Sequence, residues 1–212
     1  APRPGPLPSA TRSRKLTGKE GDHTVGFYLV EDEVTNLILP GPQGSRTATL
    51  EQSSRAVVGR YKHDLGSRFT FGAMYTGREA EGYSNHVVGV DGVMRFTDRD
   101  RVQVQLLGSE TSYPDEIVKR IGAPSGELED LSADLLYVHD TRRVDGWVAY
   151  RHLGRDFRAD LGFMPQTDVV SYVAGGDVEW IPDGSSWYSR LELRTEVSHD
   201  ETVAGEKLLD VA

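Results

Sequence analysis

The chain has 212 residues, of which 37% are hydrophobic and 8% aromatic, and its 33 acidic and 24 basic side chains give a formal net charge of −9. This length and composition allow one ordinary folded domain or part of a larger one, and the acidic balance without a long basic run argues against a nucleic-acid partner. The absence of cysteine excludes a disulfide framework, a thiolate metal site and a cysteine nucleophile.

The N-terminal residues 1–11 form a proline-rich segment that lacks the apolar core of a signal peptide. The last residues, LLDVA, fall within an apparent strand, so we expect the chain to be an internal fragment of a longer protein. No run of roughly 18 apolar residues occurs, so no transmembrane helix is expected. Transmembrane β-strands need only roughly 9 to 11 residues, half of them apolar, and remain compatible with this composition.

Alternation of apolar and polar residues predicts about ten strands and the start of an eleventh from Glu206. In chain order the predicted strands cover residues 12–19, 23–31, 54–63, 69–77, 88–96, 102–109, 132–139, 147–153, 169–181 and 187–197. Between them, 32–53 is predicted to be a long polar connection whose apolar island, 37–39, is a short loop strand, and 110–131 a long acidic loop. The expected fold class is all-β, an antiparallel up-and-down meander.

The clearest pattern is the hairpin within 84–113, which turns at 98–101. One of its faces is apolar and carries Val88, Val90, Met94, Phe96, Val102, Val104 and Leu106, and the later strand adds Leu191 and Leu193. The opposite, polar face carries Asp91, Arg95, Gln103, Gln105, Asp177, Glu179, Arg190, Glu192 and Arg194. A sheet with these two faces is suited to separate hydrocarbon from water, with the second set lining a polar interior.

The predicted short and longer connections alternate along the chain. The short ones are at Glu20, Asp64, Asp98, Asp140 and Pro182, and the longer ones begin near residues 32, 78, 110, 154 and 199. This asymmetry is typical of outer-membrane barrels, which have short periplasmic turns and longer extracellular loops. A soluble sandwich with Greek-key crossings need not show it.

Aromatic residues are predicted to form two bands, as amphipathic rings do at membrane interfaces. Phe69, Phe96, Trp147, Trp180 and Trp187 lie near the short turns, whereas Tyr75, Tyr83, Tyr113 and Tyr172 lie nearer the long connections. The alternative is that aromatics are common near strand ends in any β protein.

The segments GRYKHDLGSRFTFGAMYTGR (59–78) and YRHLGRDFRADLGFMPQTDV (150–169) resemble a largely uncharacterised bacterial family. In that family an outer-membrane-type β-barrel region follows an N-terminal family 9-like carbohydrate-binding domain. KLTGKEGDHTVGFYLVEDE (15–33) and NHVVGVDGVMRF (85–96) are also similar to it, and the DF, DLGF and P-x-T-D run within 156–168 is the most specific part.

The resemblance implies that residues 12–212 are a partial outer-membrane β-barrel region, and it implies no established reaction. The sequence departs from the family by lacking the carbohydrate-binding domain, the signal peptide and the remaining strands. A glycan partner would therefore be bound only through an upstream domain that is absent from this chain.

The connection after residue 154 concentrates charged side chains beside apolar ones. As a functional site, Arg155, Asp156, Asp160 and Asp168 would contact a ligand or ion from a loop folded into the barrel mouth. The alternative is an apolar-anchored turn in which Phe157 and Phe163 pack down and the aspartates accept hydrogen bonds from backbone amides.

No metal, cofactor or catalytic site is predicted. The acidic connection with Glu110, Asp115, Glu116, Glu127, Glu129 and Asp130 has no EF-hand spacing, so a solvated loop is expected rather than a calcium site. The six histidines include no HExxH and no close pair at a metal-ligand spacing. Carboxylate pairs such as Asp177 and Glu179 are neighbours on single strands, where ion-pair ladders explain them better than glycosidase chemistry.

The sequence therefore predicts part of a bacterial outer-membrane β-barrel that contacts membrane lipid. Its expected role is passage of a solute, or anchoring and display of an upstream carbohydrate-binding domain, rather than enzymatic catalysis. The alternative is a soluble all-β carbohydrate-binding or glycan-cleaving domain, in which the same apolar faces would turn inward as a core.

Overall fold

The computed structural model describes residues 12–41, 44–122, 124–182, 184 and 187–211. Within them, eleven strands form one antiparallel sheet, which confirms the predicted up-and-down meander. The strands are β1 (Arg12–Glu20), β2 (His23–Asp32), β5 (Ser54–Leu65), β6 (Phe69–Ala80), β7 (Tyr83–Arg95), β8 (Asp100–Ser112), β9 (Glu127–Asp140), β10 (Val144–Leu153), β11 (Val169–Trp180), β12 (Leu191–Glu201) and β13 (Lys207–Val211). The predicted proline-rich segment 1–11 lies outside the described residues.

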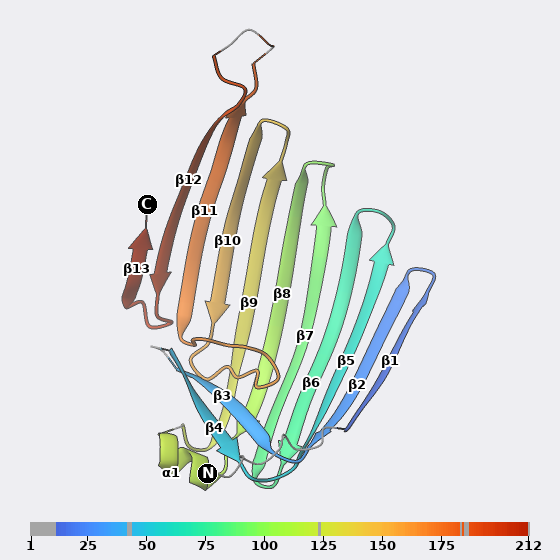
Figure 1. Ribbon diagram of the computed structural model, residues 1–212, viewed down its shortest axis with the longest axis vertical. Coiled ribbons are helices and arrows are strands. Elements are labelled where there is room, and N and C mark those ends of the chain that lie inside the picture. The colour runs from blue at the N-terminus through green and yellow to red at the C-terminus, as the bar shows by residue number, and fades with distance from the viewer. Residues whose placement is uncertain (1–11, 42–43, 123, 183, 185–186, 212) are drawn as a thin grey trace, which may run out of the picture.

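The sheet is open, with β1 and β13 at its two edges (Figure 1). Each strand pairs with its neighbour in sequence except at β2 and β5, which pair directly because a separate hairpin is inserted between them. That hairpin consists of β3 (Thr35–Gly41) and β4 (Gly44–Leu50). The predicted short strand at 37–39 is therefore part of β3, whereas β4 was not expected.

Connection lengths depart from the predicted alternation at two places. The connection expected near Arg78 is only the turn at Glu81 and Gly82, because β6 continues to Ala80 and β7 begins at Tyr83. At the other end of the sheet, the expected short turn at Pro182 belongs to a longer connection, since β11 ends at Trp180 and β12 starts at Leu191 rather than at Trp187.

The predicted acidic loop 110–131 is mostly regular structure. Strand β8 continues to Ser112, β9 begins at Glu127, and a short helix, α1 (Asp115–Ile121), lies between them. The helix carries Asp115 and Glu116 in its first turn, where acidic side chains suit the helix dipole, and it ends at Gly122, whose φ of 67° is left-handed. Among the described residues, no helix is long and apolar enough to cross a membrane.

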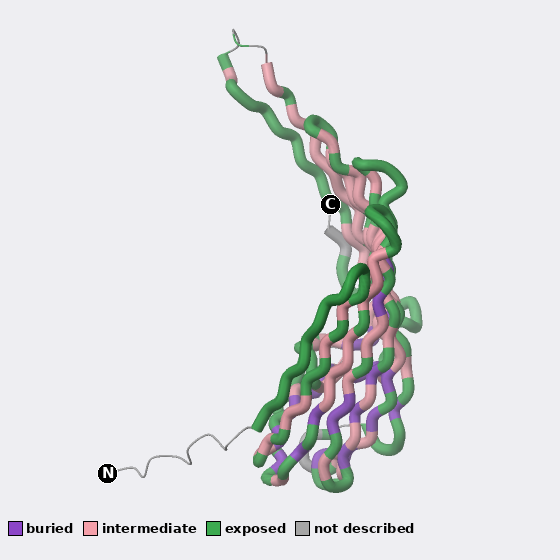
Figure 2. Tube along the Cα trace, turned by 90° about the vertical axis from the view of Figure 1, so that its right-hand side faces the viewer, coloured by how far each residue is buried: buried purple, intermediate pink, exposed green. Residues whose placement is uncertain are grey.

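The buried core lies at one end of the sheet, the end that carries the β3–β4 hairpin, α1 and the connection from β10 to β11 (Figure 2). We call this the capped end, and the end with the β1–β2 turn the turn end. A cluster of buried apolar side chains packs the hairpin and α1 on the sheet, and its members are Leu37, Leu39, Ala48, Leu50, Tyr83, Tyr113, Ile117 and Leu128.

Arg78 fastens the hairpin to the sheet through polar contacts. Its side chain is buried, and it donates hydrogen bonds to Ser54 Oγ (3.2 Å) and to the carbonyl oxygen of Asn36 (2.9 Å). A carboxylate oxygen of Asp32 lies 3.6 Å from its guanidinium. A buried charge needs such partners, so Arg78 holds β2, β3 and β5 together at the base of the hairpin.

We predict that Leu37→Ala loosens the hairpin from the sheet, because Leu37 is 1% exposed and its loss leaves a cavity in the core. A buried leucine replaced by alanine typically costs about 2–5 kcal/mol of unfolding free energy. Denaturant unfolding and amide hydrogen exchange of β3 and β4 would measure the loss. Thr47→Ala, at an exposed position of β4, is the matched control and should change stability by less than about 0.5 kcal/mol. Equal effects would contradict a packed hairpin.

Candidate functional site: the charged face and the loop folded against it

The cross-strand register sorts the side chains of the sheet onto two faces. Directly paired residues share a face, so Leu16, Phe27, Tyr61 and their partners can be followed from β1 to β12. The result is one face on which large apolar side chains are exposed. This apolar face comprises Leu16, Val25, Phe27, Tyr61, Leu65, Phe69, Phe71, Tyr75, Val88, Val90, Met94, Val104, Leu106, Leu131, Leu135, Tyr137, Val144, Val148, Tyr172, Trp180, Leu191, Leu193 and Val197.

The opposite face, which we call the charged face, carries the polar residues predicted from the sequence. Asp91, Arg95, Gln103, Gln105, Asp177, Glu179, Glu192 and Arg194 share it by register. Arg190 precedes β12, but its guanidinium reaches Glu179 and Glu192 on the same face. Phe96 likewise lies just beyond β7, in the turn, rather than within the strand.

Ion pairs bridge neighbouring strands of the charged face. Arg151 of β10 lies 2.6 Å from Asp134 of β9, and Arg194 of β12 lies 3.6 Å from Asp177 of β11. These arginines are largely exposed, and exposed pairs contribute little to stability, typically about 0–1 kcal/mol. Their consequence is electrostatic: positive and negative groups are interspersed over a water-accessible surface.

One ion pair spans three strands because of a glycine. Arg60 of β5 makes two hydrogen bonds to the Asp91 carboxylate of β7, one of them 2.7 Å long, and they pass over Gly72 of β6. A Cβ at position 72 would lie 2.5 Å from the Arg60 guanidinium and 2.7 Å from the Asp91 carboxylate. The bidentate pair therefore needs the space that glycine leaves.

The connection between β10 and β11, residues 154–168, folds onto the charged face at the capped end. Phe157 is buried there with 2% of its surface exposed, while Phe163 is 74% exposed. The base of the loop is narrow: a Cβ on Gly154 would lie 2.1 Å from the Asp130 side chain, whose carboxylate accepts hydrogen bonds from the amides of Leu131 and Asp156. The expected apolar anchor is thus present at Phe157, and the expected packing of Phe163 is wrong.

The side chain of Asn85, on β7, forms hydrogen bonds with the backbone of the loop. Its side-chain amide donates to the carbonyl oxygen of Arg158 (3.1 Å) and its side-chain oxygen accepts from the amide of Asp160 (3.0 Å). The side-chain amide of Asn85 also donates to Thr111 Oγ1, and the backbone amide of Arg158 donates to Ser109 Oγ. Asn85 is fully buried, so these contacts satisfy polar groups that water cannot reach.

Asp160 joins the loop to two stacked tyrosines. The hydroxyl of Tyr83 donates to its carboxylate at 2.7 Å, and that of Tyr113 donates at 3.0 Å. Burial raises the pKa of the Asp160 carboxyl, against the opposing effects of these hydrogen bonds and of the nearby Arg158 charge. The loop is therefore held by a buried polar network rather than by exposed contacts.

The predicted ligand-contacting residues separate into two groups. Arg155, Asp156 and Asp168 line a cavity of about 860 Å³ between the β3–β4 hairpin and the loop, whereas Asp160 is half-buried in the network just described. Asp168, at a left-handed φ of 62°, accepts hydrogen bonds from Arg155 Nε (3.3 Å) and from the amide of Val203 (3.1 Å). Three of the four residues are thus brought together and the fourth is structural.

The predicted aromatic bands are only partly formed. Phe69, Tyr75, Tyr172 and Trp180 are exposed on the apolar face, near its two ends. In contrast, Tyr83 and Tyr113 are buried on the charged side, because the loop and the hairpin cover them. Trp147 is also on the charged side, where its ring packs against Gly175.

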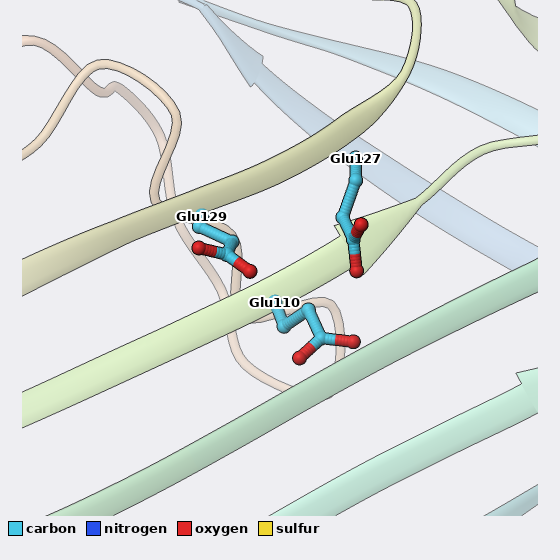
Figure 3. A group of neighbouring side chains, drawn as sticks. All are labelled: Glu110, Glu127 and Glu129. Carbon is cyan, nitrogen blue, oxygen red and sulfur yellow. The ribbon is translucent and has the colours of Figure 1, made fainter.

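Three carboxylates of the predicted acidic loop lie together on strands β8 and β9 (Figure 3). Oxygen atoms of Glu110, Glu127 and Glu129 all lie within 4.8 Å of one another, and all three side chains are exposed. Carboxylate oxygens are ligands for hard cations, but an exposed acidic cluster is common without one.

Sequence reasoning did not identify Asn85, Tyr83, Tyr113 or Arg158 as parts of this site. The hydrogen bonds that join them to the loop span 47 to 77 positions of sequence. The one available signal was an asparagine among the alternating residues of a strand, where a buried amide requires partners.

Comparison with known protein families, with curated protein sequences and with solved structures finds no match for this chain. The family likeness inferred from its sequence motifs stays a prediction.

We predict that Asn85→Ala releases the loop 154–168 from the sheet. The change leaves the carbonyl of Arg158 and the amide of Asp160 buried without this partner, and each such group costs about 1–3 kcal/mol. Hydrogen exchange within the loop should accelerate while exchange in β5 and β6 is unchanged. Asn36→Ala, at an exposed asparagine of β3, is the control and should leave loop exchange as it is.

We also predict that the loop is less firmly held at higher pH. Because the pKa of Asp160 is raised in the folded chain, the stability from its protonated form is complete below the ordinary value near 3.8 and is lost as pH rises through the raised value. Hydrogen exchange of the loop measured across this window should show the trend in the wild-type chain. Asp160→Asn should flatten it, and equal pH slopes in the two proteins would contradict the assignment.

Proposed function

We propose that the chain is a membrane-spanning segment of a β-barrel in a bacterial outer membrane, with its apolar face against lipid and its charged face toward an aqueous interior. The observation that carries the proposal is the apolar face itself, on which large hydrophobic side chains from β1 to β12 are exposed side by side. Exposed patches on soluble monomers seldom exceed a few hundred Å².

The distribution of charge supports this orientation. Along the middle of the sheet the arginines and carboxylates lie on the charged face, where they pair with one another across strands. Charged groups are costly in hydrocarbon, so segregation to one face is what a lipid-contacting strand requires. Outer-membrane strands show the same alternation of apolar outward and polar inward positions.

The two ends of the sheet suggest its direction in the membrane. The turn end has tight connections at β1–β2, β5–β6 and β9–β10, with a longer one at β11–β12. The capped end carries the hairpin, α1 and the loop 154–168, with a tight turn at β6–β7. Outer-membrane barrels have their shorter connections on the periplasmic side, so we assign the capped end to the cell exterior.

We propose passage of a solute as the role that fits the charged face and the loop best. The loop covers part of the charged face and is fixed there by Asn85 and Asp160, so it would narrow an aqueous interior at its outer mouth. Arg155, Asp156 and Asp168 border the cavity beside it and would meet an entering solute. Anchoring of an upstream glycan-binding domain is the second role, and it rests on the family likeness alone.

We predict that Val104→Arg destabilises the chain folded in lipid vesicles by about 2–4 kcal/mol, the cost of arginine on a lipid face near mid-bilayer. Val104 lies in the middle of β8 on the apolar face and is 44% exposed. Gln103→Arg is the matched control, because it places the same side chain one residue away on the charged face. The measurement is reversible denaturant titration of folding into vesicles.

The two arginine variants distinguish the proposal from a soluble all-β domain. A membrane segment should tolerate Gln103→Arg and not Val104→Arg, and it should need detergent or lipid to remain dispersed. Equal tolerance at both positions, together with a monodisperse chain in plain buffer, would overturn the proposal. Conductance across planar bilayers, with and without Asn85→Ala, would then separate passage from anchoring.

A further inference from the structure

Two histidines that are 40 positions apart meet at the turn end of the sheet. His23 begins β2 and His63 lies near the end of β5, and the antiparallel register places them directly opposite each other. Their Nδ1 atoms are 3.1 Å apart, and their rings are stacked with centroids 4.2 Å apart and planes inclined by 30°. Both belong to the same face as Tyr61, whose hydroxyl oxygen lies 2.7 Å from His23 Nδ1.

This arrangement brings two imidazole nitrogens within 3.1 Å of each other. Between two imidazole nitrogens, one must carry a proton for a hydrogen bond to form, and stacked rings align that bond poorly. A metal ion can instead accept a lone pair from each nitrogen once the two rings turn out of the stack and His23 Nδ1 leaves the Tyr61 hydroxyl. With metal–nitrogen bonds of about 2.0–2.1 Å, nitrogens 3.1 Å apart subtend about 100° at the ion, between square-planar and tetrahedral angles.

We propose that His23 and His63 form a cross-strand binding site for a transition-metal ion of the Zn²⁺ or Cu²⁺ class. Imidazole nitrogen suits these ions, and affinity within the divalent series is highest at Cu²⁺. The site lies at the protein surface, so water completes the coordination of the ion. Hard cations such as Ca²⁺ prefer oxygen ligands and are excluded by the donor set.

The bound ion links β2 to β5 at the end of the pair farthest from the inserted hairpin. Residues 33–53 separate the two strands in sequence, and only the native register places both histidines together on one face. A slip by one residue would turn one of them to the charged face. The ion therefore stabilises the correct pairing of β2 with β5 and adds stability according to its free concentration relative to Kd.

The chain contains an internal comparison for this site. His86 of β7 contacts Tyr75 of β6 much as His23 contacts Tyr61, with the hydroxyl 2.9 Å from Nδ1 and ring centroids 6.2 Å apart. The corresponding centroid distance for His23 and Tyr61 is 6.0 Å. His86 has Glu79 nearby, at 3.6 Å, instead of a second histidine, so it supplies a single imidazole in otherwise similar surroundings.

The test uses the whole chain in detergent micelles, without a polyhistidine tag. Electron paramagnetic resonance of the protein with one equivalent of Cu²⁺ should show two nitrogen ligands, and calorimetric titration should show binding of one Zn²⁺. His23→Ala and His63→Ala should each reduce the signal to one nitrogen and weaken Zn²⁺ binding by at least roughly tenfold, the low end of the loss seen for even outer-shell partners. His86→Ala should change neither.

Three outcomes would overturn the proposal. They are a wild-type Cu²⁺ spectrum with fewer than two nitrogens, two nitrogens retained in both single variants, and an equal loss of binding in His86→Ala. The wild-type spectrum is decisive even where a variant fails to fold. The result does not depend on the barrel, because the two histidines would bind the ion whether the apolar face meets lipid or another protein surface.

Discussion

The structure depends on the separation, along the middle of one sheet, of exposed apolar side chains on one face from ion pairs on the other. In a β-strand, successive side chains point to opposite faces of the sheet. A strand that alternates apolar and charged residues therefore suits a sheet with an apolar environment on one face and water on the other. Direct cross-strand pairing carries the same two faces from β2 to β12, and charged residues such as Glu31 and Arg55 join the apolar face only toward the strand ends. A single slip in register would exchange the two faces of a strand, and thereby place charge among the exposed apolar side chains.

The capped end is stabilised differently from the rest of the sheet. Buried apolar contacts are concentrated there, whereas the middle of the sheet has exposed apolar side chains on one side and ion pairs on the other. The loop 154–168 is held there mainly by polar groups. The Asn85 side chain forms hydrogen bonds with the carbonyl of Arg158 and the amide of Asp160, and the Asp160 carboxylate accepts hydrogen bonds from two tyrosines. Such contacts are directional, so they fix the position of the loop more narrowly than apolar packing alone would. The cavity lined by Arg155, Asp156 and Asp168 adjoins the loop that these contacts hold in place.

The sequence predicted the strands and their two faces because both follow from alternation within a few residues. It did not predict where β6 and β8 end, since Arg78 and Thr111 are polar and the alternation gives no sign that both are buried within strands. Strand β4 lacked an apolar run of its own and is formed by pairing with β3. The contacts of Asp160 with Tyr83 and Tyr113, and of His23 with His63, connect residues 40 to 77 positions apart. Alternation shows the face of each residue but not its partner, because the partner depends on which strands are neighbours and in which register.

The two edges of the sheet follow from the same reasoning. Strand β1 pairs only with β2, and β13 only with β12, so each presents a row of backbone amides and carbonyls without a partner strand among the described residues. In water such an edge is tolerable, although it invites pairing with other strands. In hydrocarbon each unpaired backbone group costs several kcal/mol, which is why spanning sheets are closed. The proposed contact of the apolar face with lipid therefore requires that β1 and β13 be paired in the membrane, either with each other or with further strands. The apolar face favours contact with hydrocarbon, but in hydrocarbon the sheet is stable only when both of its edges are paired. Lipid contact and closure of the sheet are therefore a single requirement.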